Sequence, residues 1–476
     1  MLTMKKLLIL TPLFALYVSN VQAQFALGAA TGNYNPTQSV WLNPSSIVGT
    51  AAYRDIQLVG VGLSLDNNMV FMPGRSFRLL GGAEQYDGSV EPQQNRGPSS
   101  HFGHLDVFAA GPSFTGVFGR FALGVHTGVR SSVGFNGVSP EMANYIFQGL
   151  GYEPQRDMVH ELSNAGVSAA AWAEAGITLG ASIVQQGKNA LHVALTPRRL
   201  MGIGAASLRV DDMRFEVGDS SNFNLYNLNA GVAWTEPGLN AGVGWGLNAG
   251  FTFIRYKEEM DRYTAFSREQ QCQTAEYQYR VGFSVLDMGS IRFSNRASHW
   301  DVAGLQVSMD DFNNEMPGNM EQLDSMITAS GQMSESVSFR MSLPTMLSLQ
   351  FDYNLGKGFF VAGVWMQGVG GGRDFSMQRA SLINVTPRFE LRRFEVSLPF
   401  TLAQYQHPRM GIAFRFNSIV IGTDRLGPLF FRSDVFGMDA YVALKYTIFK
   451  SQRCKGRVKS RGKMDSTAGI PCPTWD

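Results

Sequence analysis

Charged side chains are scarce in this sequence. They make up 16% of the 476 residues, against roughly 25% in ordinary soluble proteins. Basic and acidic residues nearly balance, 40 against 38, for a net charge of +2. This balance excludes a strongly basic nucleic-acid-binding protein, because no overall positive field is present to attract phosphates. The 44% of hydrophobic residues excludes intrinsic disorder as well.

Cysteine is also rare, with 3 residues in the chain. Three are too few for a disulfide scaffold, and Cys272, Cys454 and Cys472 lack the paired spacing of a zinc site. Cys454 and Cys472 could form one disulfide that closes a loop of about eighteen residues, worth on the order of 3 kcal/mol. Two free thiols are the alternative.

Long apolar runs are missing beyond the N-terminus, which excludes a bundle of membrane helices. Residues 1–23 combine Lys5 and Lys6, an apolar stretch and a Val-Gln-Ala ending, the pattern of a cleaved signal peptide. A single membrane anchor is the alternative, but about twelve apolar residues fall short of the ~20 that a spanning helix needs. We therefore expect an exported protein.

What the sequence has in abundance is alternation of period two, the pattern of β-strands. In residues 241–253 every second position from Ala241 to Phe253 is apolar, and the positions between hold only Gly, Asn and Thr. In residues 277–285 the apolar face begins with Tyr277 and Tyr279. Similar alternation recurs at 171–183, 226–234, 347–354, 394–401, 410–417 and 438–448.

The composition of the two faces favours a transmembrane antiparallel β-barrel. The polar face carries Gly, Ser, Asn, Gln and Thr, with few of the Lys and Glu that face water in a soluble protein. Such a barrel has an apolar outside and must close, since an open edge in hydrocarbon leaves backbone groups unpaired. Residues 50–450 would supply about fourteen strands, within a range of roughly 12–16. A soluble periplasmic all-β protein is the alternative.

Polar residues on these strands are the expected lining of the lumen, because they lie opposite the apolar face. Ordinary lining without a functional role is the alternative for each of them. The candidates are Asn227, Asn229, Gln350, Asp352, Asn354 and Arg415.

Some segments break the alternation. Residues 139–166, including 156–162, read as helical, with Ser139 as the cap, and residues 300–330 look similar. Turn signals such as residues 236–240 predict that neighbouring strands are joined as tight hairpins. After the last predicted strand, residues 451–476 form a basic tail, which would lie in the periplasm if the strand number is even.

The segment after the predicted signal contains two Asn-Pro pairs, Asn35-Pro36 and Asn43-Pro44. The second is followed by Ser-Ser-Ile and then by strand-like residues 56–65. This order resembles the opening of outer-membrane barrels related to the long-chain fatty-acid transporter family. The resemblance implies a cell outer-membrane location and a hatch, residues 24–49, that folds into the lumen. For Asn43-Pro44 a simple turn is the alternative.

A closer resemblance is to an uncharacterised barrel family of Bacteroidota outer membranes. It extends from the Asn-Pro segment through Leu343-Pro344-Thr345 and residues 422–428 to the final strand. The resemblance supplies no substrate. Members of this family that are related to secretion and gliding machineries act as partners of larger complexes. For the tail, the resemblance therefore implies a docking role as an alternative.

Motifs for catalysis or cofactor binding are missing. The histidines are scattered, and His101 and His104 lack a third ligand for a metal. The glycines at 368–372 lack the lysine and the strand–helix context of a phosphate loop. We therefore expect no enzyme activity, no cofactor and no metal site.

Two functional hypotheses follow. The first is a porin-like outer-membrane barrel that contacts lipid and passes or binds a small hydrophobic solute beside its hatch. The alternative is a structural or interaction barrel whose tail docks a periplasmic protein or a secretion-type assembly.

Overall fold

The computed structural model describes residues 26–73, 91–218, 223–260, 276–308, 333–369, 375–377, 379–427 and 434–449. The predicted signal peptide at 1–23, the tail at 451–476 and all three cysteines lie outside the described residues, so those assignments stay predictions.

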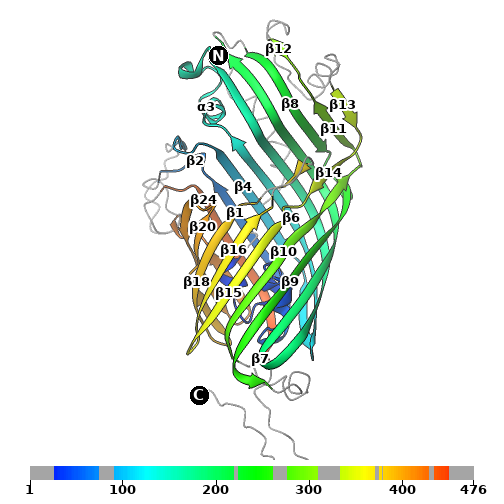
Figure 1. Ribbon diagram of the computed structural model, residues 1–476, viewed down its shortest axis with the longest axis vertical. Helices are drawn as coiled ribbons and strands as arrows, with labels where there is room; N and C mark the ends of the chain where they lie inside the picture. The colour runs from blue at the N-terminus through cyan, green and yellow to red at the C-terminus, as the bar shows by residue number, and fades with distance from the viewer. Residues whose placement is uncertain are drawn as a thin grey trace, which may run out of the picture.

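One closed sheet of 22 hydrogen-bonded segments dominates the described residues (Figure 1). A second sheet pairs β2 (Val70–Phe71) with β3 (Gln93–Gln94). The closed sheet consists of β1 (Ala52–Asn67), β4 (His101–Ala110), β5 (Ser113–Phe118), β6 (Phe121–Val138), β7 (Val159–Val217), β8 (Phe223–Thr235), β9 (Gly242–Met260), β10 (Tyr277–Phe293), β11 (Ala297–Val302), β12 (Val307–Ser308), β13 (Met333–Ser336), β14 (Phe339–Ser342), β15 (Met346–Gly356), β16 (Phe359–Gly368), β17 (Phe375–Ser376), β18 (Leu382–Glu390), β19 (Phe394–Ser397), β20 (Phe400–Ala403), β21 (His407–Met410), β22 (Ile412–Phe416), β23 (Ile419–Thr423) and β24 (Gly437–Phe449).

The sheet closes because β1 pairs with β24 on one side and with β4 and β5 on the other. The described pairings are antiparallel except for a two-residue parallel contact between β14 and β17. Several segments are collinear pieces of one wall strand: β8 and β9, for example, both pair with β7. The predicted antiparallel barrel of 12–16 wall strands is therefore confirmed within the described residues.

In the wall, apolar side chains face outward and polar side chains face the lumen, which is the reverse of a soluble protein. Leu179 is 59% exposed, Trp245 63% and Phe416 69%, whereas their polar neighbours Asn248 and Arg415 are each 2% exposed. Because a wide apolar surface of this kind is stable only against hydrocarbon, the chain is an outer-membrane β-barrel. None of the helices among the described residues is long and apolar enough to span a bilayer.

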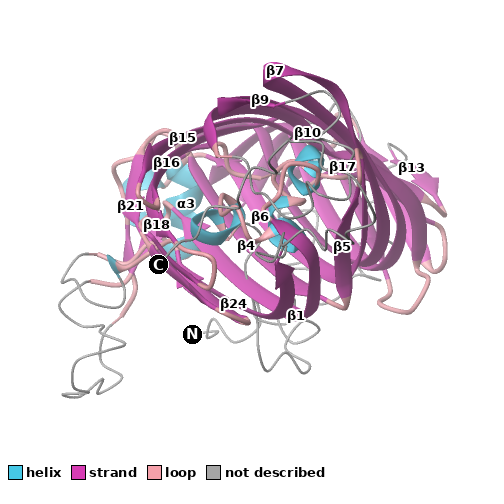
Figure 2. Cartoon of the chain, turned by 90° about the horizontal axis from the view of Figure 1, so that it is seen from below, coloured by secondary structure: helices cyan, strands magenta, loops and turns pink. Residues whose placement is uncertain are grey.

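Short helices lie inside and above the barrel. Figure 2 shows helices enclosed by the ring of strands. Inside are α1 (Leu27–Ala30), α2 (Pro36–Ser39) and the 3-10 helix η2 (Pro44–Ile47), all within the segment that is predicted to be a hatch and that keeps this name below. Two further helices, α3 (Pro140–Gln148) and η3 (Glu153–Gln155), lie near the end of the barrel that is farther from these three. As predicted, Ser139 caps α3: its side chain accepts a hydrogen bond from the backbone N–H of Met142.

Four expectations from the sequence were wrong. The predicted helical segment 300–330 is not helical where the structure describes it, since residues 300–302 belong to β11 and residues 307–308 to β12. Residues 156–162 do not continue the helix, because Asp157 has a positive φ of 57° and β7 begins at Val159. Residues 236–240 join β8 to β9, which do not pair with each other, so this turn interrupts one wall strand instead of closing a hairpin. Tyr277 faces the lumen and not the lipid, because the register with β9 shifts between Tyr277 and Tyr279.

Candidate functional site

The hatch is built from short turns that its sequence specifies locally. Pro36 and Pro44 each occupy the first turn of a helix, where proline has no backbone donor to lose. The Asn43 side chain accepts hydrogen bonds from the backbone N–H of Ser45 at 3.0 Å and from its hydroxyl at 2.7 Å. Asn35 instead donates from Nδ2 to the carbonyl of Ala29 at 3.0 Å, which ties α2 to α1.

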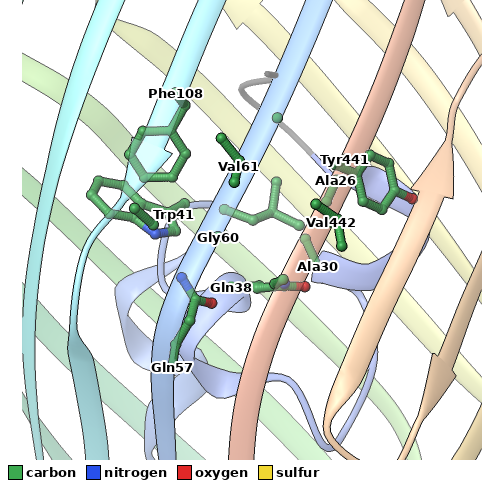
Figure 3. Close-up of a pocket in the computed structure, with 14 residues that line it drawn as sticks. Ala26, Ala30, Gln38, Trp41, Gln57, Gly60, Val61, Phe108, Tyr441 and Val442 are labelled. Atoms are coloured by element: carbon green, nitrogen blue, oxygen red, sulfur yellow. The ribbon is translucent and has the colours of Figure 1, made fainter. Parts of the chain in front are cut away.

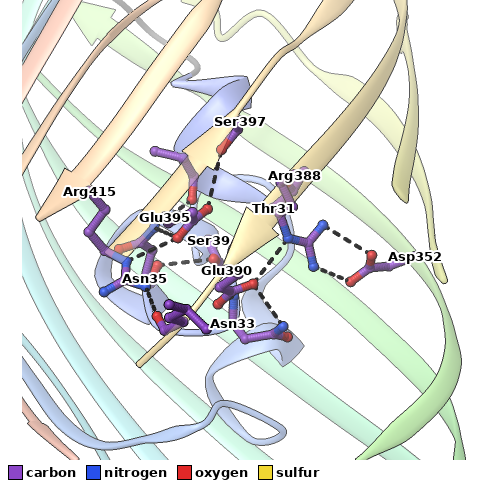
Figure 4. Close-up of polar contacts among 12 residues, drawn as sticks. Thr31, Asn33, Asn35, Ser39, Asp352, Arg388, Glu390, Glu395, Ser397 and Arg415 are labelled. Carbon is purple, nitrogen blue, oxygen red and sulfur yellow. Dashed lines mark hydrogen bonds and ion pairs between the residues drawn. The ribbon is translucent and has the colours of Figure 1, made fainter. Parts of the chain in front are cut away.

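One side of the hatch is bound to carboxylates of β18 and β19 (Figure 4). Asn33 donates from its backbone N–H and from Nδ2 to Glu390, at 2.8 and 3.0 Å. Asn35 Nδ2 also donates to Glu395, at 3.3 Å. The guanidinium of Arg415 donates to Glu395 at 3.0 Å, so this buried carboxylate is paired.

A second set of contacts binds the hatch to β9, β10 and β15. Asn43 Nδ2 donates to Gln350 Oε1 at 2.8 Å and to the carbonyl of Phe251 at 3.1 Å. The hydroxyls of Ser45 and Thr252 lie 2.7 Å apart. Gly250 makes room for this contact, because a Cβ at that position would overlap with Asn43 Oδ1. The hatch therefore contacts two separate parts of the lumen wall, with β16 between them.

A third attachment joins the hatch to the first and last strands. Thr37 Oγ1 donates to Asp55 of β1 at 2.6 Å, and Lys445 of β24 lies 3.3 Å from the same carboxylate. The backbone N–H of Leu27 donates to Asp424 at 3.3 Å. These contacts hold the hatch against the wall.

Replacing Asn43 by alanine should loosen the hatch without unfolding the barrel. The substitution removes hydrogen bonds to the wall and within η2, so local opening should become easier by about 1–3 kcal/mol. Hydrogen exchange of backbone amides in residues 27–48 measures this change. The matched control is Ser46→Ala, because the buried Ser46 hydroxyl has no partner among the described residues. Equal exchange rates in the two variants would contradict the assigned role of Asn43.

Two cavities flank the hatch. The first, which we call the seam pocket, has a volume of about 50 Å³ and lies between the hatch, β1, β4 and β24 (Figure 3). The second, the wall pocket, has about 70 Å³ and lies between the hatch and β9, β10, β15 and β16. The wall pocket contains the charged side chains of Arg280 and Asp352, whereas no charged side chain lines the seam pocket.

An ionic layer crosses the lumen beyond the hatch. Asp287 accepts two hydrogen bonds from Arg130, both at 2.9 Å, and lies 2.7 Å from Arg198 and 3.2 Å from Arg379. Glu174 pairs with Arg198 at 3.0 Å. All five side chains are nearly inaccessible to solvent, so each charge depends on the others for its compensation.

An apolar layer follows on the far side of the ionic layer. Along β7 the hatch contacts the wall at Gly180, the ionic layer lies at Glu174, and the apolar layer begins at Trp172. Strands β14 and β17 supply part of it. Its members are Ala170, Trp172, Leu200, Ala205, Ala233, Ala241, Ile291, Phe293, Ala297, Phe339, Met341, Leu343, Phe375 and Met377.

The structure brings some of the lumen candidates to the hatch and leaves others elsewhere. Gln350 contacts Asn43, Arg415 supports Glu395, and Asp352 is bound by Arg280 and Arg388 beside the wall pocket. The other candidates make local contacts away from the hatch: Asn227 donates to Asp212, Asn229 accepts from the Gly304 N–H, and Asn354 accepts from the Gly356 N–H.

Several residues of the site were not singled out from the sequence. They include Asp55, Thr252, Glu390 and Lys445 at the hatch, and the whole ionic layer. For the charged residues among them, the sequence signal was a charge inside an alternating strand. Such a charge is strongly disfavoured on a lipid-facing surface and therefore indicates the lumen. No cluster of three metal-binding side chains occurs in the part of the chain that the structure describes.

Comparison with known proteins gives a family. The family model DUF5723, a family of unknown function, matches residues 94–424. No curated protein matches the sequence.

Among solved structures, a deletion mutant of the TodX monoaromatic hydrocarbon channel is 10% identical, with 91% of this chain and 96% of that chain covered and a TM-score of 0.43. A Pseudomonas aeruginosa FadL homologue is 11% identical, with 91% and 99% covered and a TM-score of 0.40. The P. putida toluene transporter TodX is 8% identical, with 86% and 93% covered and a TM-score of 0.36. At these identities the likeness concerns the fold alone.

Proposed function

This chain belongs to the DUF5723 family of unknown function, and we propose that it binds a small hydrophobic solute and passes it across the outer membrane when the hatch moves. The observation that carries the proposal is a hatch held against three sides of the lumen wall, with a cavity on either side of it. The seam pocket is lined mainly by apolar side chains and glycine, among them Trp41, Leu42 and Phe108. Such a lining suits a solute that carries little hydration.

Passage would require a second position of the hatch. The hatch contacts are mostly hydrogen bonds between neutral groups and carboxylates, which water can replace one by one. A solute shifts the hatch only if it binds the open arrangement more tightly than the closed one. No covalent step is needed.

A wide aqueous pore fits the lumen less well than a path for a hydrophobic solute. The hatch, the ionic layer and the apolar layer occupy successive levels of the lumen in the described residues. Hydrated ions would have to cross the apolar layer, where nothing replaces their hydration. An apolar solute meets no such penalty.

A disulfide between hatch and wall tests this function. In a background with the three native cysteines replaced by serine, Ser45→Cys and Thr252→Cys would be combined, since their hydroxyls lie 2.7 Å apart. We expect oxidation to abolish protein-dependent uptake of the apolar dye N-phenyl-1-naphthylamine by cells that carry the protein in their outer membrane. Reduction should restore the uptake.

The matched control places the same bond within the wall. Thr178 and Thr196 lie on the two arms of β7 with their hydroxyls 2.8 Å apart, so Thr178→Cys with Thr196→Cys leaves the hatch free. Uptake should not respond to oxidation in this variant. If the hatch-locked protein takes up dye as fast as the wall-locked one, hatch movement plays no part and the proposal fails.

A further inference from the structure

Short turns connect the strands at the lower end of the barrel in Figure 1. At this end β1 begins opposite the last residue of β24, and β7 turns back at Gly187. At the other end, β6 and β7 are joined by the long connection 139–158. Outer-membrane barrels have short turns in the periplasm and longer loops outside, so the lower end is the periplasmic one. Besides the turn of β7, the short turns are residues 119–120, 357–358, 391–393 and 417–418.

These turns are basic. All of them except 417–418 contain Lys or Arg, and none of the five contains Asp or Glu. The long connection 139–158 at the other end has three acidic residues, Glu141, Glu153 and Asp157, against Arg156. The five turns together are called the basic rim below. Its basic residues are Arg120, Lys188, Lys357, Arg392 and Arg393.

Exposed aromatic rings accompany the basic rim. Phe118 and Phe121 flank the first turn and are 44% and 52% exposed. Phe359, which follows the second turn, is 53% exposed, and Phe416, which precedes the last, is 69% exposed. Aromatic side chains of membrane proteins gather at the level of the lipid head groups. The basic rim therefore lies at the height of the lipid phosphates.

A further arginine near the rim lies on the outer wall itself. Arg54 of β1 pairs with Ile448 of β24, which is 36% exposed on the outer face. The neighbouring Asp55 faces the lumen, where Lys445 lies 3.3 Å from its carboxylate. Nε of Arg54 is buried and donates to no acceptor within the described residues. A cation this close to hydrocarbon is strongly stabilised by an adjacent anion.

Arg120 lies on the neighbouring hairpin. On its other edge Arg54 pairs with Gly116 of β5, and β5 leads directly into the turn that contains Arg120. Arg120 is exposed, and its guanidinium lies 4.8 Å from the centre of the Phe121 ring. Gly116 brings no side chain to the surface between the two arginines. Arg54 and Arg120 therefore flank one patch of outer wall that also contains Phe118.

We propose that Arg54 and Arg120 bind the phosphate of an anionic phospholipid of the phosphatidylglycerol class in the periplasmic leaflet. Guanidinium groups match the geometry of phosphate oxygens. The acyl chains would lie against Leu58 and Val59, which are 54% and 45% exposed farther along β1. A zwitterionic lipid gains less, because its own ammonium group already compensates its phosphate. The exposed aromatic rings favour a membrane lipid over a soluble acidic polymer, which has no need of an apolar surface.

Native mass spectrometry tests the site. The full chain would be released from detergent in an equimolar mixture of phosphatidylglycerol and phosphatidylcholine, and the ratio of the two bound lipids measured. We expect the intact protein to retain phosphatidylglycerol preferentially. Arg54→Gln with Arg120→Gln should lower this preference about tenfold or more, because each basic side chain at a membrane surface contributes roughly fivefold.

Two control variants separate charge from packing and from position. Arg54→Lys with Arg120→Lys keeps both charges and should keep most of the preference. Arg199→Gln with Arg296→Gln removes two arginines outside the basic rim, one 5.1 Å from the Trp245 ring and one paired with Glu236, and should leave the preference unchanged. Heat-dependent gel migration verifies that each variant is folded.

The outcomes are independent of the hatch, so this inference goes beyond the proposed function and can fail separately from it. Equal retention of the two lipids by the intact protein overturns the site, as does an unchanged preference in Arg54→Gln with Arg120→Gln. Sedimentation with isolated peptidoglycan that requires both arginines, without a lipid preference, would assign the basic rim to an acidic polymer and also overturn it. Dye uptake that ignores the hatch lock affects the proposed function alone.

Discussion

Replacing Asp287 by asparagine is expected to lower the free energy of unfolding by about 3–5 kcal/mol, the cost of breaking a buried ion pair. Asp287 is 3% exposed and compensates three guanidinium groups, those of Arg130, Arg198 and Arg379. Asparagine has nearly the same shape but no charge. Arg130 and Arg198 would then share the carboxylate of Glu174.

The urea midpoint of the reconstituted barrel, followed by heat-dependent gel migration, measures this loss. Asp212→Asn is the matched control: Asp212 is only partly buried and accepts a hydrogen bond from the Asn227 side chain. Adding Arg379→Gln to Asp287→Asn should recover part of the stability, because a buried cation that has lost its ion pair with Asp287 is removed. A midpoint within error of the control would show that the ionic layer is not a coupled unit.

Removing the hatch should have the largest functional effect. Deletion of residues 27–47 takes away α1, α2 and η2 and leaves β1 and its pairing intact. The polar and charged wall side chains that bind the hatch, such as Glu390 and Glu395, would then face water. We expect protein-dependent uptake of N-phenyl-1-naphthylamine into proteoliposomes to rise by roughly tenfold or more, because the hatch no longer blocks the path of an apolar solute. Ion conductance should stay low, because hydrated ions still meet the apolar layer.

A synthetic peptide of residues 24–50 should reduce this uptake again when added from the hatch side, whereas a scrambled peptide of equal composition should not. Uptake equal to that of the intact protein would contradict the expectation. It would place the main barrier in the ionic and apolar layers instead of the hatch.

The role of the tail, residues 451–476, stays a prediction, as does the proposed bridge between Cys454 and Cys472, since both lie outside the described residues. Assignment to Bacteroidota also stays a prediction.

The barrel was predictable because its signal is local. Alternation in residues 171–183 places Leu179 outside and Glu174 inside without reference to any other strand, and the structure agrees. The bulges were not predictable. Tyr277 was placed on the wrong face because one shifted position against β9 reverses the alternation.

The sequence by itself determined the apolar outside, the polar lumen and the short turns begun by Pro36 and Pro44, because each follows from residues close together in the chain. Tertiary structure alone decided which charges meet and how the wall closes. Arg130 and Asp287 are 157 residues apart, and the closing pair, β1 with β24, joins strands from opposite ends of the described chain. Such pairings are set by the closure of the whole barrel. No single segment of the sequence contains the information that fixes them.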